Sequence, residues 1–221
     1  MLMLTRTRTA LPVALLLALL LPLPHAAAED AATQVRVTTN MGDFVIEVRN
    51  DRAPLTAANF LRYVREGFYS NTLLHRVIAN FVIQGGGYDA TTLALKPTHE
   101  SIFNESGNGL QNKRGAVGLA RADAPHSGNA QFFVDLVDNP DLDPVPTRWG
   151  YTVFGRVVQG MDVIDRIGET ATGARGPWKA DSPLKPVIIE KIEIISPANS
   201  SSAPAVTPVT PPPQNDILSP K

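Results

Sequence analysis

The chain has 221 residues, contains no cysteine and carries a formal net charge of −1 at pH 7. The lack of cysteine excludes disulfide bonds and lipid attachment to a processed N-terminal cysteine. The basic residues are scattered, which argues against a nucleic-acid-binding track or a membrane-binding face.

The first 28 residues have the order of a cleavable secretory signal. Arg6 and Arg8 give a basic start, residues 11–23 form an apolar run, and three alanines at 26–28 suit cleavage after Ala28. A membrane anchor is the weaker alternative, because the run is shorter than the ~20 residues of a span and contains two prolines. We therefore expect export to the periplasm, with full secretion as the alternative.

A β-hairpin and a helix are predicted next. Val35 and Val37 alternate with polar residues before a glycine-containing turn, and a second alternating run follows it over residues 44–48. Pro54 suits a first helical turn, and Gly67 lies where that helix should stop. The apolar stripe of this helix consists of Ala57, Phe60, Leu61 and Val64.

The rest of the folded part, which we place at residues 34–195, is mostly strand-like. One short helix is predicted over residues 161–167, and Asn80 marks a turn. Many strands with two helices and no regular βα alternation favour an antiparallel barrel or sandwich. The predicted strands cover residues 73–78, 81–84, 116–120, 131–137, 151–158 and 187–195.

Residues 196–221 differ in composition from the segments before them. They are rich in proline, serine, threonine and alanine and include three consecutive prolines at 211–213. Too few large apolar residues remain there to offset the entropy of ordering, so we predict a disordered or extended tail.

Common catalytic motifs are mostly missing from the sequence. A chain without cysteine and with well-separated histidines predicts no metal site, and we expect no cofactor. No G-x-S-x-G motif is present, so the adjacent His126 and Ser127 indicate a loop and not a hydrolase pair. Three glycines at 85–87 lack the lysine and helix start of a phosphate-binding loop. The histidines are His25, His75, His99 and His126.

Several longer motifs carry a resemblance to a known family. HRVIANFVIQGG at 75–86 places an arginine, a phenylalanine and a glutamine in apolar strand sequence, which alone would suggest a surface arginine on an edge strand. GAVGLAR at 115–121, AQFFV at 130–134 and YTVFGRVVQGMDVIDRI at 151–167 follow in order. Together they resemble the cyclophilin family over about residues 35–195. The resemblance implies a mainly β fold, a closed eight-stranded antiparallel β-barrel capped by two α-helices.

The resemblance also implies a function and a site. Cyclophilins are peptidyl-prolyl cis–trans isomerases, and Arg76 matches their catalytic arginine, with Gln84 matching the residue that orients it. Twisting an Xaa–Pro bond makes the prolyl nitrogen an acceptor, to which a guanidinium group can donate. The implied substrate-binding residues, which wall the proline pocket or line the path of the peptide, are Phe81, Val82, Ala120, Arg121, Gln131, Phe133, Leu142 and Tyr151.

Some positions depart from the family pattern. Val82 stands where many members have methionine, a conservative change in a pocket. Asp141 stands where cyclosporin-sensitive members have tryptophan, so we expect weak cyclosporin binding. Tyr151 replaces a histidine of many eukaryotic members, which resembles the bacterial periplasmic subgroup.

The expected partners are proline-containing, unfolded or partly folded polypeptides. We expect a monomer that binds no nucleic acid and makes no stable membrane insertion after signal cleavage. Two alternatives remain open. The protein could be a chaperone or proline-binding module with incidental turnover, or its tail could dock on a partner as a polyproline II segment.

Overall fold

The computed structural model describes residues 33–195. The expectations for the signal at 1–28 and for the tail at 196–221 lie outside the described residues. Within the described part, no helix combines the length and apolar character that crossing a membrane requires.

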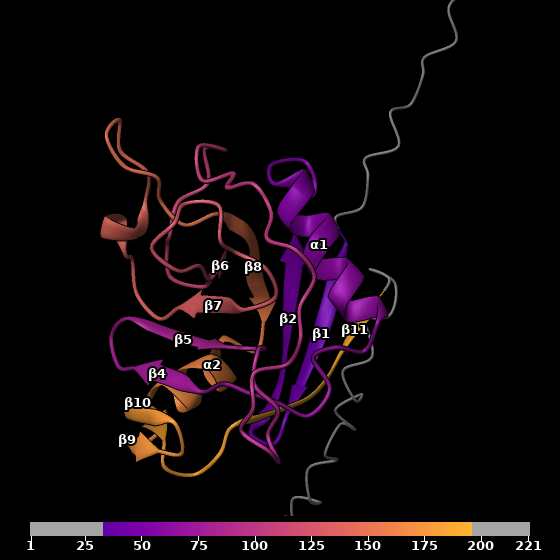
Figure 1. Ribbon diagram of the computed structural model, residues 1–221, viewed down its shortest axis with the longest axis vertical. Helices are drawn as coiled ribbons and strands as arrows, with labels where there is room; N and C mark the ends of the chain where they lie inside the picture. The colour runs from indigo at the N-terminus through magenta and orange to yellow at the C-terminus, as the bar shows by residue number, and fades with distance from the viewer. Residues whose placement is uncertain (1–32, 196–221) are drawn as a thin grey trace, which may run out of the picture. The chain divides into compact units, whose positions relative to one another are not determined.

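The described residues form a mainly β structure with two α-helices, as predicted (Figure 1). The helices are α1 (Pro54–Arg65) and α2 (Met161–Gly168), and a short 3₁₀ helix, η1, covers Pro140–Leu142. The strands are β1 (Gln34–Thr39), β2 (Gly42–Val48), β3 (Thr72–Leu73), β4 (Arg76–Ile78), β5 (Val82–Gly85), β6 (Ala116–Leu119), β7 (Phe132–Asp135), β8 (Val153–Gln159), β9 (Thr172–Arg175), β10 (Trp178–Pro183) and β11 (Ile188–Ile195).

Nine of these strands form one antiparallel sheet in the order β3-β11-β1-β2-β8-β6-β7-β5-β4. Its two edge strands, β3 and β4, are consecutive in the chain and separated only by Leu74 and His75. The sheet is therefore curled, so that the end of β3 lies close to the start of β4 although the two strands do not pair. Backbone hydrogen bonds from Leu73 N–H to the Tyr88 carbonyl (2.9 Å) and from Gly86 N–H to the Leu73 carbonyl (3.0 Å) connect β3 with the chain that follows β5.

The expected closed eight-stranded barrel is not confirmed, because the sheet has nine strands and its ladder is open. The single strand expected over residues 73–78 is divided in two. Leu73, Leu74 and His75 are all buried, so the alternation of a strand is lost there. Leu74 N–H instead donates to the carbonyl of Val187, at 3.0 Å.

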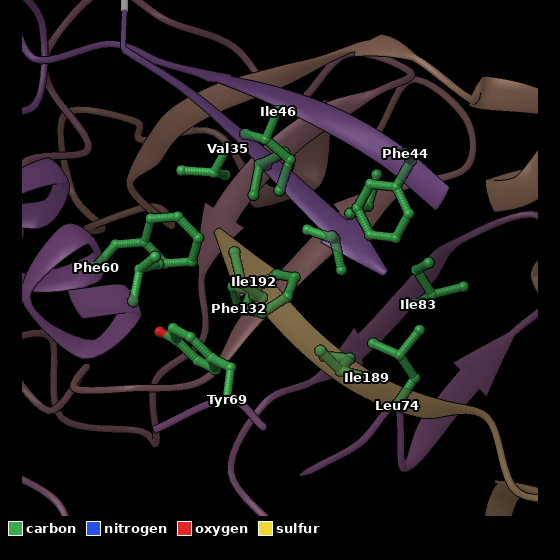
Figure 2. Close-up of a cluster of buried hydrophobic side chains, with 14 of the residues drawn as sticks. Val35, Phe44, Ile46, Phe60, Tyr69, Leu74, Ile83, Phe132, Ile189 and Ile192 are labelled. Atoms are coloured by element: carbon green, nitrogen blue, oxygen red, sulfur yellow. The ribbon is translucent and has the colours of Figure 1, made fainter. Parts of the chain in front are cut away.

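Helix α1 packs against the sheet through the predicted apolar stripe. Phe60 is nearly fully buried, and its ring lies 5.7 Å from that of Phe132, edge to face. Figure 2 shows Phe60 directed toward side chains of β1, β2 and β11 such as Val35, Ile46 and Ile192. Burial of these large apolar side chains is the main term that stabilises the fold.

The first turn of α1 is capped from a distant part of the chain. Ala53 precedes the helix and offers no side-chain cap. The carboxylate of Glu105 instead accepts the backbone N–H groups of Leu55 (3.1 Å) and Thr56 (2.8 Å). A negative charge at this end satisfies free N–H groups and suits the helix dipole, so Glu105 ties a long surface loop to the core.

A second, two-stranded sheet of β9 and β10 was not predicted from the sequence. This hairpin lies beside β4 (Figure 1), and its Trp178 ring stacks on that of His75 at 5.4 Å between centroids. The sequence-based assignment left residues 168–186 without secondary structure. The hairpin therefore adds a wall next to the strand that carries Arg76.

Candidate active site

A cavity of about 350 Å³ opens beside β4, β5 and β7. Its lining contains all the residues that the sequence resemblance assigned to the site except Gln131. These residues come from segments as far apart in the chain as β4 and the start of β8. The lining residues are Arg76, Phe81, Val82, Gln84, Ala120, Arg121, Phe133, Leu142 and Tyr151.

The pairing of β4 with β5 places Arg76 beside Gln84. The two residues are directly opposite in the antiparallel ladder, and the next pair, Val77 and Ile83, points into the core. Asn80 has φ of 57° in the tight connection between the strands, which confirms the predicted turn. The Arg76 Nη1 group donates to Gln84 Oε1 at 3.3 Å.

Gln131 lies outside the cavity lining but is joined to it. Gln84 Nε2 donates to Gln131 Oε1 at 3.3 Å, so the two amides and the guanidinium group of Arg76 form a polar row. The Gln84 amide accepts from Arg76 and donates to Gln131. Because Gln84 is held from both sides, the rotamers open to Arg76 are limited. The row holds a positive charge at the edge of an apolar space.

The apolar wall of the cavity depends on Phe133. This residue lies opposite Gln84 on β5 and opposite Gly118 on β6. A Cβ atom on residue 118 would overlap the Phe133 ring, so only glycine leaves the ring where it is. The ring also meets Tyr151 edge to face, with centroids 5.9 Å apart. Two aromatic rings thus shape a slot for a flat apolar group.

Arg121 is held by backbone carbonyl groups and not by an acidic side chain. Its guanidinium group donates to the carbonyls of Gly150 (3.3 Å), Ala122 (2.9 Å), Asp123 (3.2 Å) and Trp149 (3.1 Å). Its Cζ atom lies 4.4 Å from the centroid of the Tyr151 ring. Sequence reasoning assigned the main chain here to peptide contact and did not foresee that this side chain ties two loops together.

A larger groove of about 680 Å³ continues from the cavity and shares Arg76, Gln84, Ala120 and Arg121 with it. Its other wall is the β9–β10 hairpin, including Trp178, which the sequence-based prediction missed. The sequence did hold one signal for this wall: Trp178 stands in an otherwise polar segment, and a tryptophan usually packs against other residues or binds a ligand.

His75 lies between this groove and the core. Burial and, to a lesser extent, the adjacent charge of Arg76 together lower the pKa of His75 to about 4. The imidazole is therefore neutral at neutral pH and adds no charge to the site. Arg76 then supplies a fixed positive charge beside an apolar cavity, an arrangement suited to a neutral ring next to a developing hydrogen-bond acceptor.

Comparisons with known proteins identify the family. The family model for cyclophilin type peptidyl-prolyl cis-trans isomerase/CLD matches residues 34–194. Peptidyl-prolyl cis-trans isomerase B of Escherichia coli K12 is 50% identical over 159 residues, covering 71% of this chain and 96% of the relative. A peptidyl-prolyl cis-trans isomerase of Acinetobacter baylyi is 44% identical over 184 residues, covering 83% and 95%.

A solved structure has the same fold. It is a cyclophilin type peptidyl-prolyl cis-trans isomerase of Cryptosporidium parvum, crystallised in the presence of the dipeptide Ala-Pro. The TM-score is 0.63 at 27% sequence identity, over 74% of this chain and 99% of that one.

Proposed function

The chain belongs to the cyclophilin-type peptidyl-prolyl cis–trans isomerases, and from this we propose that Arg76 and the apolar cavity together stabilise a twisted Xaa–Pro bond. The observation that carries the proposal is the position of Arg76, which lines the cavity and is hydrogen-bonded to Gln84.

The reaction needs stabilisation of a distorted amide and no covalent step. Resonance in the C–N bond sets a barrier of ~18–20 kcal/mol, and uncatalysed exchange of Xaa–Pro bonds takes tens to hundreds of seconds. Reaching a rate on the order of 10² s⁻¹ requires about 5–6 kcal/mol of stabilisation. The site gains rate only by binding the twisted amide better than either planar isomer.

Arg76 supplies the hydrogen bond that strengthens as the amide twists. In the planar amide the prolyl nitrogen shares its lone pair with the carbonyl group, whereas twisting localises that pair and makes it an acceptor. A charged donor at this position therefore favours the transition state over the ground state. Gln84 and Gln131 restrict the guanidinium group to this direction, so less entropy is lost when the bond forms.

The cavity holds the proline ring while the acyl side rotates. Phe81, Val82, Phe133 and Leu142 provide apolar walls, and the ring of Tyr151 packs against that of Phe133. Removing water from this space lowers the local dielectric constant and strengthens the contact of Arg76 with the amide.

The substrates we propose are proline-containing segments of exported, partly folded proteins, and the location we propose is the periplasm. The support is the signal-like order of residues 1–28, with a basic start, an apolar run and small residues at the expected cleavage site. Cell fractionation with N-terminal sequencing of the mature protein tests this location. Recovery from the cytosol of a protein that still begins with residues 1–28 would contradict the proposed location.

The mechanism is tested by NMR exchange on an Ala-Pro peptide. The wild-type protein should accelerate exchange, and Arg76→Ala should lower kcat/KM by about 10²–10³, the usual cost of removing one such donor. Arg156→Ala is a matched control, since Arg156 pairs with Glu47 on the sheet and does not line the cavity. An Arg76→Ala variant with an unchanged rate would refute the assignment.

One surface feature favours chaperone-like binding as a second function. Phe103 and Trp149 are 55% and 42% exposed, and both rings contact that of His126. Such an exposed aromatic cluster suits apolar segments of unfolded clients. If this function holds, Arg76→Ala still suppresses client aggregation, whereas Phe103→Ser loses that effect but keeps isomerase activity.

A further inference from the structure

A buried carboxyl group lies behind the cavity, and the proposed mechanism does not use it. Asp135 is two residues beyond Phe133 on β7, so the two side chains share one face of the strand. Asp135 is 0% exposed, and its Oδ2 atom has no hydrogen-bond partner in the part of the protein that the structure describes. A buried, half-satisfied acidic group is costly and requires an explanation.

Asn139 connects this carboxyl group to one wall of the cavity. Its Nδ2 atom donates to Asp135 Oδ1 at 2.6 Å and to the backbone carbonyl of Phe81 at 3.0 Å. The amide has two protons, so each acceptor receives one. Asp135 therefore fixes the direction of the Asn139 side chain, and Asn139 holds the backbone of Phe81.

The backbone of Asn139 connects to a second wall. Its carbonyl accepts the N–H group of Leu142 at 3.0 Å, and its own N–H donates to the carbonyl of Asn112 at 2.7 Å. Phe81 and Leu142 both line the cavity, although they come from segments about 60 residues apart. Asn139 bonds to both segments, and the Phe81 carbonyl also accepts the N–H group of Leu136 at 2.9 Å.

We propose that Asp135 is a positioning residue for the isomerase: acting through Asn139, its carboxyl group keeps the Phe81 and Leu142 walls at the separation that fits a proline ring. The inference rests on the proposed function of this cavity. Asp135 touches no substrate, and its effect reaches the reaction only through the shape of the cavity.

The protonation state of Asp135 gives the arrangement a distinctive pH dependence. The net pKa of Asp135 is raised to about 7: burial is the main cause, the hydrogen bond from Asn139 opposes the rise, and the nearby charges of Asp143 and Asp138 contribute to it. Strands β5 and β6 bring no charged side chain. Near the site, Lys113 and Arg114 before β6 pair with Asp138 and Asp165, and Arg148 donates to the backbone carbonyl of Asp143.

Ionisation of Asp135 therefore leaves a buried negative charge without a cation of its own. The hydrogen bond from Asn139 to Oδ1 is stronger to the ionised group, but Oδ2 then lacks a partner while charged, which favours water entry behind the cavity and disturbs the packing of its walls. We expect the cavity to hold proline most tightly when Asp135 is protonated, and to weaken as the pH rises through about 7.

The test measures kcat and KM for Ala-Pro peptides between pH 6 and 8. In the wild type, KM should rise about threefold over this range, whereas Asp135→Asn, which mimics the protonated form, should show a low and constant KM. Asp135→Ala should raise KM about fivefold at pH 6 with kcat nearly unchanged, the size expected for one lost hydrogen bond. Asp51→Asn, which removes an exposed carboxylate that pairs with Arg49 and does not act on the pKa of Asp135, should keep the wild-type profile.

Two results would overturn the proposal: a pH profile of Asp135→Asn identical to that of the wild type, or a folded Asp135→Ala variant with unchanged KM. If Asp135→Ala fails to fold, the pH dependence of KM in Asp135→Asn still tests the proposal. A wild-type protein without isomerase activity would instead refute the proposed function of the cavity, so the two failures are distinguishable.

Discussion

The apolar cavity and the larger groove beside it share Arg76, Gln84, Ala120 and Arg121, yet their other walls come from different kinds of structure. The cavity is built mainly on neighbouring strands of the nine-stranded sheet, where the register fixes which side chains meet. The outer wall of the groove is a separate hairpin whose residues are mostly exposed or partly exposed.

This difference suggests that the cavity has a fixed shape, whereas the wall of the groove can adjust to different side chains. Strand pairing holds Phe133 to within a narrow range of positions, as a ring-binding slot requires. The hairpin is anchored to the main body mainly by Trp178, which packs on His75 and Tyr88. We propose that the cavity recognises proline itself, whereas the groove accepts varied neighbouring residues. Three experiments below test this contrast, in order of decreasing expected effect.

Altering Phe133 should damage the cavity most. Phe133→Leu keeps an apolar side chain but removes the flat wall, and we expect a loss in kcat/KM of about tenfold, in line with the 1–3 kcal/mol of one well-fitted apolar contact. Gly118→Ala should give a similar loss, because the added methyl group displaces the Phe133 ring.

Phe132→Leu is the control for this experiment. Phe132 is next to Phe133 but points into the core, where it meets Phe60. This variant should lower the melting temperature and leave KM unchanged. If Phe132→Leu and Phe133→Leu affect KM equally, the assignment of the Phe133 cavity as the proline-binding site is wrong.

The two buried titratable groups should give the cavity and the groove opposite pH responses. Behind the cavity, Asp135 has its pKa raised from 3.8 to about 7, so its contribution to stability is present below pH 4 and is lost as the pH rises through 7. Beside the groove, His75 has its pKa lowered from 6.5 to about 4, so its contribution is present above pH 6.5 and is lost as the pH falls through 4.

Asp135→Asn separates these two contributions. Its melting temperature should exceed that of the wild type by about 5 °C at pH 8 and by little at pH 4, since only the wild type has a carboxyl group to ionise. Thermal unfolding followed by circular dichroism measures this difference. A gain of the same size at both values of pH would mean that ionisation of Asp135 does not limit stability.

Altering the groove should have the smallest effect. Trp178→Ala should leave the rate on an Ala-Pro dipeptide substrate unchanged and raise KM for longer peptides about twofold to threefold, as expected for a partly exposed contact at the rim of a site. Steady-state kinetics with peptides of two lengths checks this. Equal losses for both lengths would show that the hairpin supports the cavity and does not contact the flanking residues.

The sequence was most informative where local pattern and long motifs agreed. The pairing of Arg76 with Gln84 follows from two short strands around a turn at Asn80, and both the turn and the pairing lie within 12 consecutive residues. The first hairpin and both helices were predicted for the same reason, since their apolar periodicity is local.

The features that the sequence did not predict depend on distant contacts. The strand expected over residues 73–78 divides because Leu74 bonds to Val187, more than 100 residues away. The β9–β10 hairpin has few apolar residues of its own and is anchored by contacts of Trp178 with His75 and Tyr88. The link between Asp135 and Phe81 likewise exists only once β5 and β7 are paired.

The shortness of the two edge strands of the curled sheet has a consequence for a protein that acts on polypeptides. An unpaired strand is a template on which another polypeptide can add and start an aggregate. Here β3 has two residues and β4 has three, and β10 covers β4 on its outer side. The large sheet therefore offers almost no free backbone at its edges, and we expect polypeptides that reach the proposed proline site not to assemble on this surface.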